Sequence, residues 1–287
     1  LNKKSKIFIA GHNGMVGSAI LKKFKEENFK NLITINKNQL DLLNQKKVNF
    51  FLKKKKPDYV IIAAARVGGI IANSNNKASF IYENLQIQNN LIHLSFINGV
   101  KNLLFLGSSC IYPRGINKHI SEKRLLDGKL EKTNDSYSIA KIAGLKMCED
   151  YSNNYNLNYK SLMPSNMYGP GDNYDLKNSH FFAALLKKAY LASKSKNKIL
   201  NVWGSGKPKR ELLFVDDFAS AVLFFLKKKI KEPFINIGTG VDYSIKWYAN
   251  FITKQLGNDI KIKFDKKKPD GMFRKKLDIS LAQKYGW

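Results

Sequence analysis

The stretch Lys6-Ile-Phe-Ile-Ala-Gly-His-Asn-Gly-Met-Val-Gly17 decides the fold of this protein. An apolar run leads directly into three spaced glycines. Glycine permits a tight turn, lets backbone N–H groups approach a pyrophosphate, and lets the next helix pack on the strand. Between a strand and a helix, this pattern predicts a dinucleotide-binding turn rather than a purely structural one. The expected contacts are Gly11, Asn13, Gly14, Met15, Val16 and Gly17.

Outward from this turn, apolar runs alternate with amphipathic segments. The runs cover 6–10, 32–36, 58–65, 102–108, 159–163 and 234–237, and helical patterns lie near 16–28, 44–56, 80–99, 137–156 and 215–229. Continuously apolar strands separated by helices predict a doubly wound α/β fold with a parallel sheet, the Rossmann arrangement. Loops rich in Gly and Pro follow Met163. We therefore expect a cofactor domain over 1–164 and a smaller α+β domain over 165–287, with 211–240 returning to the main sheet.

The composition raises the question of nucleic-acid binding. The 287 residues hold 50 Lys and Arg against 22 Asp and Glu, a formal charge of +28. Only five of the basic residues are arginine, the residue best suited to bidentate phosphate and base contacts. The lysines are spread along the chain beside many Asn and Ile, which a composition bias of the genome explains. We expect no nucleic-acid partner.

Other classes are excluded more directly. Hydrophobic residues make up 44% of the chain, too many for a disordered protein. No apolar run approaches the ~18 residues of a membrane span, and no export signal precedes the first strand. The two cysteines, Cys110 and Cys148, form neither a disulfide framework nor a metal motif. We expect a cytoplasmic protein with no bound metal and no membrane partner.

The ends of the second and third predicted strands offer further cofactor contacts. No acid stands in Ile35-Asn-Lys-Asn38 for a ribose 2′-OH, and Lys37 could meet a 2′-phosphate, which favours NADP. Asp41 either accepts from the adenine amino group or caps the helix that begins near 44. Small residues at the end of the third strand, Ala64 and Ala65, leave room for a cofactor, although tight helix packing also explains them.

The fourth predicted strand ends at Ser108, and a helix carries Tyr137 and Lys141. The i,i+4 spacing places Tyr137 and Lys141 on one helical face. There the ammonium would stabilise a phenolate and lower the pKa of Tyr137. Ser108 and Tyr137 could then bind a substrate carbonyl and protonate it while hydride arrives from a nicotinamide.

These motifs resemble the extended short-chain dehydrogenase/reductase superfamily and, within it, the GDP-L-fucose synthase family. The likeness runs nearly end to end and rests on Phe8-Ile-Ala-Gly-His-Asn-Gly-Met-Val-Gly-Ser18, Val67-Gly-Gly-Ile70, Leu104-Phe-Leu-Gly-Ser-Ser-Cys-Ile-Tyr-Pro113, Asn178-Ser-His180 and Trp203-Gly-Ser-Gly206. It implies a GDP-4-keto-6-deoxy-D-mannose substrate, which is epimerised at C3 and C5 and then reduced at C4 by NADPH.

The resemblance also implies roles for individual residues. Cys110 would be the base and His180 the acid of the epimerisation, while Ser108 binds the C4 oxygen, Tyr137 donates a proton, and Lys141 tunes Tyr137 and holds the nicotinamide ribose. Taken without the resemblance, Cys110 could equally be a small buried hydrophobe, as Cys148 is expected to be, and His180 a helix-start residue.

Binding residues are implied in the same way. Cofactor contacts would include Pro164, Asn166 and His180, and substrate contacts would be Ser108, Ser109, Lys188, Trp203, Arg210 and Asp270, the last within Pro269-Asp-Gly271. Asn166 could instead stabilise a turn, and Trp203 could belong to the core. The family implies a homodimer through the helices near 80–99 and 137–156.

The chain departs from the family pattern in two places. Family members often carry Arg where this chain has Asn13, which weakens the NADP inference, and they usually continue for about 30 residues beyond the position of Trp287. A missing C-terminal helix is therefore expected. The alternatives are another sugar-nucleotide 4-epimerase or dehydratase of the same superfamily, and a nucleotide-binding scaffold that holds nucleic acid on its lysines.

Overall fold

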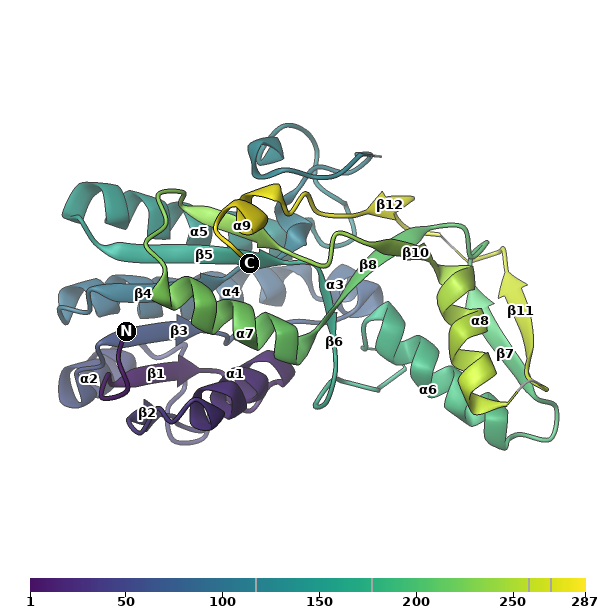
Figure 1. Ribbon diagram of the computed structural model, residues 1–287, viewed down its shortest axis with the longest axis horizontal. Coiled ribbons are helices and arrows are strands. Elements are labelled where there is room, and N and C mark those ends of the chain that lie inside the picture. The colour runs from purple at the N-terminus through teal and green to yellow at the C-terminus, as the bar shows by residue number, and fades with distance from the viewer. Residues whose placement is uncertain (117, 177, 258, 269) are drawn as a thin grey trace.

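The computed structural model describes residues 1–116, 118–176, 178–257, 259–268 and 270–287, which form a larger and a smaller lobe (Figure 1). The strands are β1 Ile7–Ala10, β2 Leu32–Ile33, β3 Tyr59–Ile62, β4 Asn102–Leu106, β5 Asn158–Pro164, β6 Asn166–Tyr168, β7 Ile199–Trp203, β8 Lys209–Phe214, β9 Phe234–Ile237, β10 Asp242–Ser244, β11 Lys261–Asp265 and β12 Arg274–Lys275. The α-helices are α1 Met15–Glu26, α2 Gln45–Lys55, α3 Ile70–Asn75, α4 Lys77–Ile97, α5 Asp135–Tyr155, α6 Phe181–Lys194, α7 Val215–Lys227, α8 Ile245–Leu256 and α9 Ser280–Lys284, with 3₁₀ turns η1 Ser109–Ile111 and η2 Glu122–Arg124.

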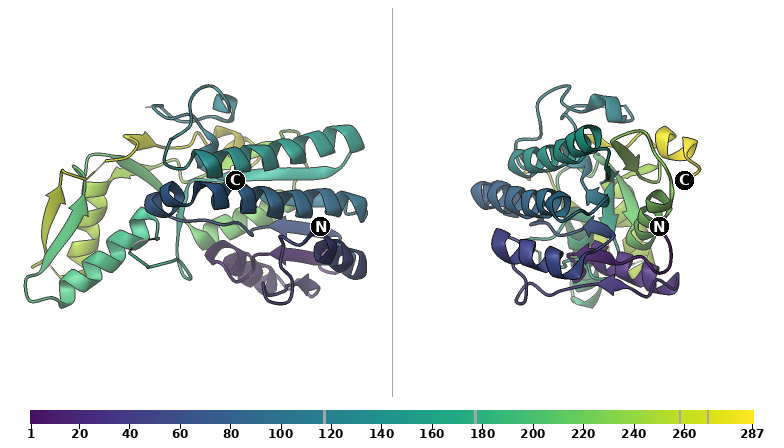
Figure 2. Two further views of the ribbon diagram at one scale, coloured as in Figure 1. Left: turned by 180° about the vertical axis from the view of Figure 1, so that it is seen from behind. Right: turned by 90° about the vertical axis from the view of Figure 1, so that its left-hand side faces the viewer.

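A parallel sheet of six strands forms the larger lobe, in the order β2-β1-β3-β4-β5-β9. Successive residues of β1 serve opposite faces: Ile7 and Ile9 pack with Phe24 and Phe218, whereas Phe8 packs with Phe51. Helices α1 and α7 thus cover one face, and α2, α4 and α5 cover the other, as the end-on view of Figure 2 shows. This arrangement confirms the predicted doubly wound α/β fold.

The order of the strands reverses between β1 and β3, where a doubly wound sheet binds its ligands. The backbone is tightly packed at this point, since a Cβ on Gly11 would lie 2.6 Å from the Ala64 nitrogen. The neighbouring strand β2 stops at Ile33 and is shorter than predicted. Beyond it the chain turns toward the glycine loop, where Asn13 Nδ2 donates to Asn36 Oδ1 at 2.8 Å.

Over the residues that the structure describes, the smaller lobe has two small sheets and two helices. Strand β8 pairs with β10, β12 and β6, while β7 and β11 form a parallel pair. Helices α6 and α8 contribute Leu185, Ala189, Tyr248 and Ile252 to a core that also contains Val202 of β7. The two lobes meet where β5, which lies beside the edge strand β9 of the large sheet, continues into β6.

The chain returns to the larger lobe at α7, later than the expected start at 211, because β8 belongs to the smaller lobe's sheet. Helix α7 packs on α1, and β9 extends the main sheet beside β5. The last residues also pack on the larger lobe, where the rings of Trp287 and Phe224 lie 5.7 Å apart. Among the helices in the described ranges, none has the length and apolar character needed to cross a membrane.

Candidate functional site

The glycine turn has the form of an anion site. Gly14 caps α1 without a side-chain hydrogen bond, and the first turn of the helix carries no acidic residue. A Cβ on Gly17 would lie 2.1 Å from the Gly11 carbonyl oxygen, so helix and turn touch through backbone atoms. The uncapped N–H groups at Met15 and Val16 and the glycine cradle fit a pyrophosphate.

Polar residues follow β2 beside this turn. Asn13 occupies the position next to Gly14 and bonds to Asn36, while Lys37 is exposed. Asp41 Oδ1 accepts from the Leu43 backbone N–H at 3.0 Å. The alternative in which Asp41 caps α2 is wrong, because Asn44 is the cap and accepts from the Lys47 N–H.

The first polar cluster lies at the end of β4 and on α5. Burial raises the pKa of Tyr137, the nearby Cys110 sulfur adds to the rise, and a hydrogen bond with Ser108 opposes it. Lys141 is 4% exposed and donates to the Leu106 carbonyl at 2.8 Å, and burial lowers its pKa to about 7. The expected lowering of the Tyr137 pKa by Lys141 is therefore wrong for this structure, since desolvation dominates both groups.

The second group surrounds Cys110 in η1. Its sulfur accepts hydrogen bonds from Asn134 Nδ2 and Lys275 Nζ, each at 3.3 Å, and its backbone N–H donates to Ser108 Oγ at 3.2 Å. Cys110 is half-buried among polar partners, unlike Cys148, which is fully buried in the core as predicted. A purely apolar role for Cys110 is thus excluded. Asn134 stands one helical turn before Tyr137, a spacing that reveals it in the sequence, whereas Lys275 carries no local signal among so many lysines.

His180 stands at the start of α6, where it caps the helix without a side-chain bond. The residue as a whole is exposed, but desolvation of the imidazole by the protein around it lowers its pKa; Asp172 opposes this effect and Lys275 adds to it. The turn before His180 rests on the loop after β3, since the Gly69 N–H donates to the Asn178 carbonyl at 2.8 Å. Lys275 therefore interacts electrostatically with both Cys110 and His180.

A third cluster lies in the smaller lobe. Lys188 Nζ lies 4.7 Å from the centre of the Trp203 ring, and this ring is 46% exposed, so a core role for Trp203 is wrong. Burial lowers the pKa of Arg210, and Asp270 opposes it. Asp270 itself accepts from the Ser205 N–H at 2.6 Å and holds the Gly204–Gly206 turn. Pro269 lies outside the described residues.

The remaining predicted residues occupy the junction of the lobes. Pro164 ends β5, and Asn166 lies in β6, where its Nδ2 donates to the Glu211 carbonyl at 3.1 Å rather than stabilising a turn. Ser109 is buried in η1, and Ala64 and Ala65 are half-buried after β3.

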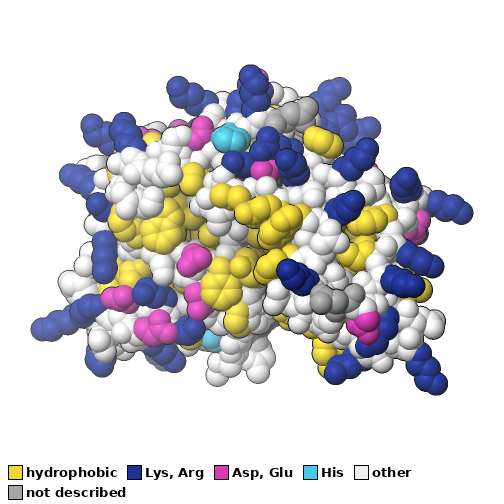
Figure 3. All heavy atoms as spheres, turned by 45° about the vertical axis from the view of Figure 1, so that its right-hand side comes forward, with side chains coloured by type: hydrophobic (Ala, Val, Ile, Leu, Met, Phe, Trp, Pro, Cys, Tyr) yellow, Lys and Arg dark blue, Asp and Glu magenta, His cyan; other side chains and the backbone are white. Residues whose placement is uncertain are grey.

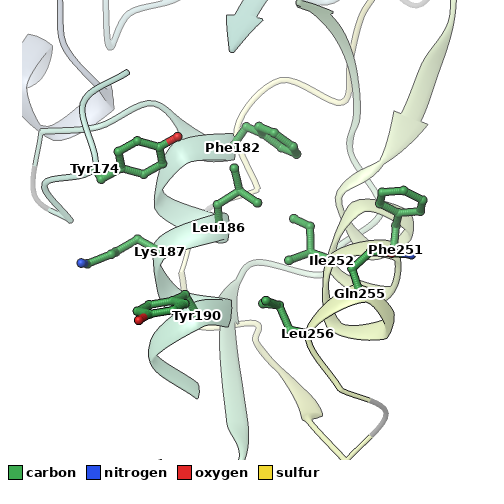
Figure 4. Close-up of a pocket in the computed structure, with 9 residues that line it drawn as sticks. All are labelled: Tyr174, Phe182, Leu186, Lys187, Tyr190, Phe251, Ile252, Gln255 and Leu256. Carbon is green, nitrogen blue, oxygen red and sulfur yellow. The ribbon is translucent and has the colours of Figure 1, made fainter. Parts of the chain in front are cut away.

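An apolar groove of about 400 Å³ lies elsewhere, between α6 and α8 (Figure 4). Phe182 and Leu186 line it from one side and Ile252 and Leu256 from the other. None of the predicted site residues lines it, and we assign the chemistry to the polar site at Cys110. Within the described ranges, no group of three or more His, Cys, Asp or Glu is arranged to hold a metal ion.

Known proteins are similar to this chain over most of its length. The model of the NAD dependent epimerase/dehydratase family matches residues 7–238. GDP-L-fucose synthase 1 of Arabidopsis thaliana is 46% identical, covering 100% of this chain and 88% of that protein. GDP-L-fucose synthase of Escherichia coli (strain K12) is 44% identical over 99% of this chain and 91% of that protein.

Solved structures agree with the sequence comparison. A GDP-L-fucose synthetase from Naegleria fowleri bound to NADP superposes with a TM-score of 0.90 at 26% identity, covering 100% of this chain and 89% of that one. The chain therefore belongs to the NAD dependent epimerase/dehydratase family, in the branch that contains the GDP-L-fucose synthases.

Proposed function

We propose that this protein converts GDP-4-keto-6-deoxy-D-mannose into GDP-L-fucose, by epimerisation at C3 and C5 followed by NADPH-dependent reduction at C4. The observation that carries the proposal is that groups suited to reduction and a group suited to epimerisation lie together at one site. Ser108 and Tyr137 form a carbonyl-protonating group, and Cys110 beside them is a thiol held by two hydrogen-bond donors. The relatives named above support the choice of a GDP-sugar.

The glycine turn would hold the NADP pyrophosphate at the α1 N-terminus. Lys37 and Asn13 would lie near the adenosine ribose, with Asp41, Ala64 and Ala65 beside the adenine end. Tyr137, Lys141, Pro164, Asn166 and His180 would border the nicotinamide end. When bound, NADPH supplies the hydride for the reduction at C4.

Epimerisation starts at the carbons next to the C4 carbonyl. Cys110 accepts the proton from C3 or C5 as the C–H bond breaks, and the electron pair moves toward the carbonyl oxygen, which Ser108 and Tyr137 hold. His180 then returns a proton to the opposite face of the same carbon. A pKa lowered by the surrounding protein makes the His180 imidazolium a stronger acid for this step.

Reduction uses the same carbonyl contacts. Tyr137 donates its phenolic proton to the C4 oxygen as carbon four gains a hydride. Burial keeps this phenol protonated at neutral pH, which is the state that a general acid needs. Ser109, Lys188, Trp203, Arg210 and Asp270 would bind the GDP-sugar, and the Arg210 guanidinium is suited to its diphosphate.

The test is NADPH oxidation with GDP-4-keto-6-deoxy-D-mannose, followed at 340 nm, with the product identified by NMR. We expect consumption of NADPH and formation of GDP-L-fucose. Parallel assays with UDP-hexoses test the alternative of a 4-epimerase, and GDP-mannose tests a dehydratase. No loss of absorbance at micromolar enzyme would refute the proposal.

A homodimer is proposed for the assembly, through α4 and α5. Both helices carry exposed apolar side chains, among them Tyr82 at 63% and Ile139 at 48% exposure. The cytoplasm is the proposed location, since the two free cysteines are suited to a reducing compartment.

A further inference from the structure

Lys275 joins the smaller lobe to the catalytic sulfur. It lies on β12, 165 positions along the chain from Cys110, and its Nζ donates to Cys110 Sγ at 3.3 Å. Asn134 Nδ2 donates to the same sulfur from the start of α5. The sulfur thus receives hydrogen bonds from two elements, and only Lys275 brings a positive charge with its bond.

The backbone that carries Lys275 is anchored on both sides. Strand β12 pairs with β8, with Arg274 opposite Lys209 and Lys275 opposite Arg210. On the other side, the Ile120 N–H donates to the Lys276 carbonyl at 2.9 Å. These contacts fix the backbone position from which the Lys275 side chain extends.

A neighbouring ion pair strengthens this anchor. Arg274 donates twice to Asp242, from Nε at 2.6 Å and from Nη2 at 2.9 Å, and the Asp242 side chain is 5% exposed. Because the pair reaches across β8, which lies between β10 and β12, it ties β12 to the rest of this sheet, and the ammonium is placed by the fold of the smaller lobe.

We propose that Lys275 is a positioning residue that holds the Cys110 sulfur as a thiolate, so that the base for epimerisation is built from residues of both lobes. The role of this base in epimerisation rests on the proposed function. The effect of Lys275 on the Cys110 sulfur does not depend on any substrate.

The electrostatics of the site agree with this geometry. Burial raises the pKa of the Cys110 thiol, but the Lys275 charge and the hydrogen bonds from Ser108, Lys275 and Asn134 outweigh burial, and the pKa ends below its ordinary value. Among the described residues, Tyr137 on α5 is a further titratable group that interacts with the sulfur. Lys275 also interacts with His180, on α6, and lowers its pKa. One ammonium thus favours the deprotonated form of both groups, which supplies the Cys110 thiolate that a base requires and makes the His180 imidazolium release its proton more readily.

The test measures the sulfur directly. Alkylation of Cys110 by iodoacetamide is followed against pH without any substrate, and the modified peptide is identified by mass spectrometry to separate it from the buried Cys148. We expect Lys275→Met to move the midpoint of the alkylation profile upward by at least ~1 pH unit. Lys275→Arg should keep the midpoint near that of the wild type. Lys263→Met, which removes one charge from an exposed position on β11, serves as the matched control and should leave it unchanged.

Lys275→Gln keeps a hydrogen-bond donor without the charge and covers the case in which the Met variant does not fold. An unchanged midpoint in either folded variant would refute the proposal. Exchange of solvent deuterium into C3 and C5 adds a second readout: Lys275→Met should slow it at pH 7 and recover part of the rate at higher pH. A shifted midpoint in an enzyme without this exchange would reject the proposed function and leave the role of Lys275 intact.

Discussion

Tyr137 and Lys141 show how burial changes the properties that residue types suggest. The spacing of the two residues led us to expect an ammonium that lowers the pKa of the phenol, but burial raises the pKa of Tyr137 and lowers that of Lys141. Both shifts favour the neutral form, which is the response of any ionisable group to an environment that solvates charge poorly. The phenol therefore keeps its proton at neutral pH, as the proposed role of Tyr137 as proton donor requires.

Lys141 should contribute measurably to the pH dependence of the free energy of unfolding. Its pKa is about 7 in the folded protein and has the ordinary value of 10.5 in the unfolded chain. Between these values the unfolded state binds a proton that the folded state does not, so this group makes the free energy of unfolding rise with pH, by at most ~1.4 kcal/mol per pH unit. Urea denaturation from pH 7 to 10 should show this component in the wild type and in Lys263→Met, but not in Lys141→Met. Parallel curves for all three proteins would contradict the expected titration.

Cys110→Ser should separate the two halves of the reaction. A serine hydroxyl is far less acidic than a thiol and stays protonated near neutral pH, so it cannot accept the substrate proton as a thiolate does. Exchange at C3 and C5 should therefore fall by at least ~100-fold, the usual contribution of general-base catalysis. NADPH binding, measured by fluorescence, should not change. Cys148→Ala removes the buried cysteine instead, and we expect normal exchange from it. Wild-type exchange rates in Cys110→Ser would remove Cys110 from the mechanism.

Individual elements differ in how far local sequence specifies them. The β1–turn–α1 unit lies within about two residues of its predicted bounds, because its apolar run and glycines act over neighbouring positions. Strand β2 is shorter than its apolar pattern predicts, and the chain beyond it contacts the glycine turn through Asn36 and Asn13. The turn that presents His180 likewise depends on a distant loop, through Gly69.

Gly69→Ala tests that dependence. A Cβ on Gly69 would lie 2.3 Å from the Ser179 carbonyl oxygen, so the turn before His180 must shift. We expect epimerisation to slow by at least ~10-fold, in line with the cost of a misplaced acid, while NADPH affinity stays close to that of the wild type. Gly99→Ala is the control: it introduces strain at a positive φ but has no neighbour within 4 Å. Equal losses of activity in both variants would indicate general destabilisation instead.

At the level of the molecule, the site is completed by both lobes. The larger lobe supplies Ser108, Cys110 and Tyr137, and the smaller lobe supplies His180 and Lys275. The basic side chains are distributed around the surface view in Figure 3 rather than gathered in one stripe. Such a surface gives the two anionic ligands a general electrostatic attraction.

If the proposed dimer is correct, introducing charged side chains into its interface should lower the mass that the protein shows in sedimentation. Tyr82 on α4 and Ile139 on α5 lie near the end where Lys77 and Asp135 pair, at 2.8 Å. Placing Glu at both positions would bury two carboxylates in the interface, so we expect a monomer where the wild type sediments as a dimer. Phe50→Glu introduces the same charge at an exposed position of α2 and should leave the dimer intact. A wild type that sediments as a monomer would contradict the proposed assembly.

Local sequence patterns were enough to predict the doubly wound sheet, the glycine turn and the placement of Tyr137 and Lys141 on one helix. Those features depend on spacings of a few residues, which hydrophobic periodicity and turn chemistry encode directly. The family resemblance identified Cys110 and His180 as the candidate acid–base pair. Folding was needed to bring Lys275 to the Cys110 sulfur and Gly69 to the turn before His180. It was also needed to set the pKa of Lys141, because burial and contacts between distant segments exist only once both lobes have packed together.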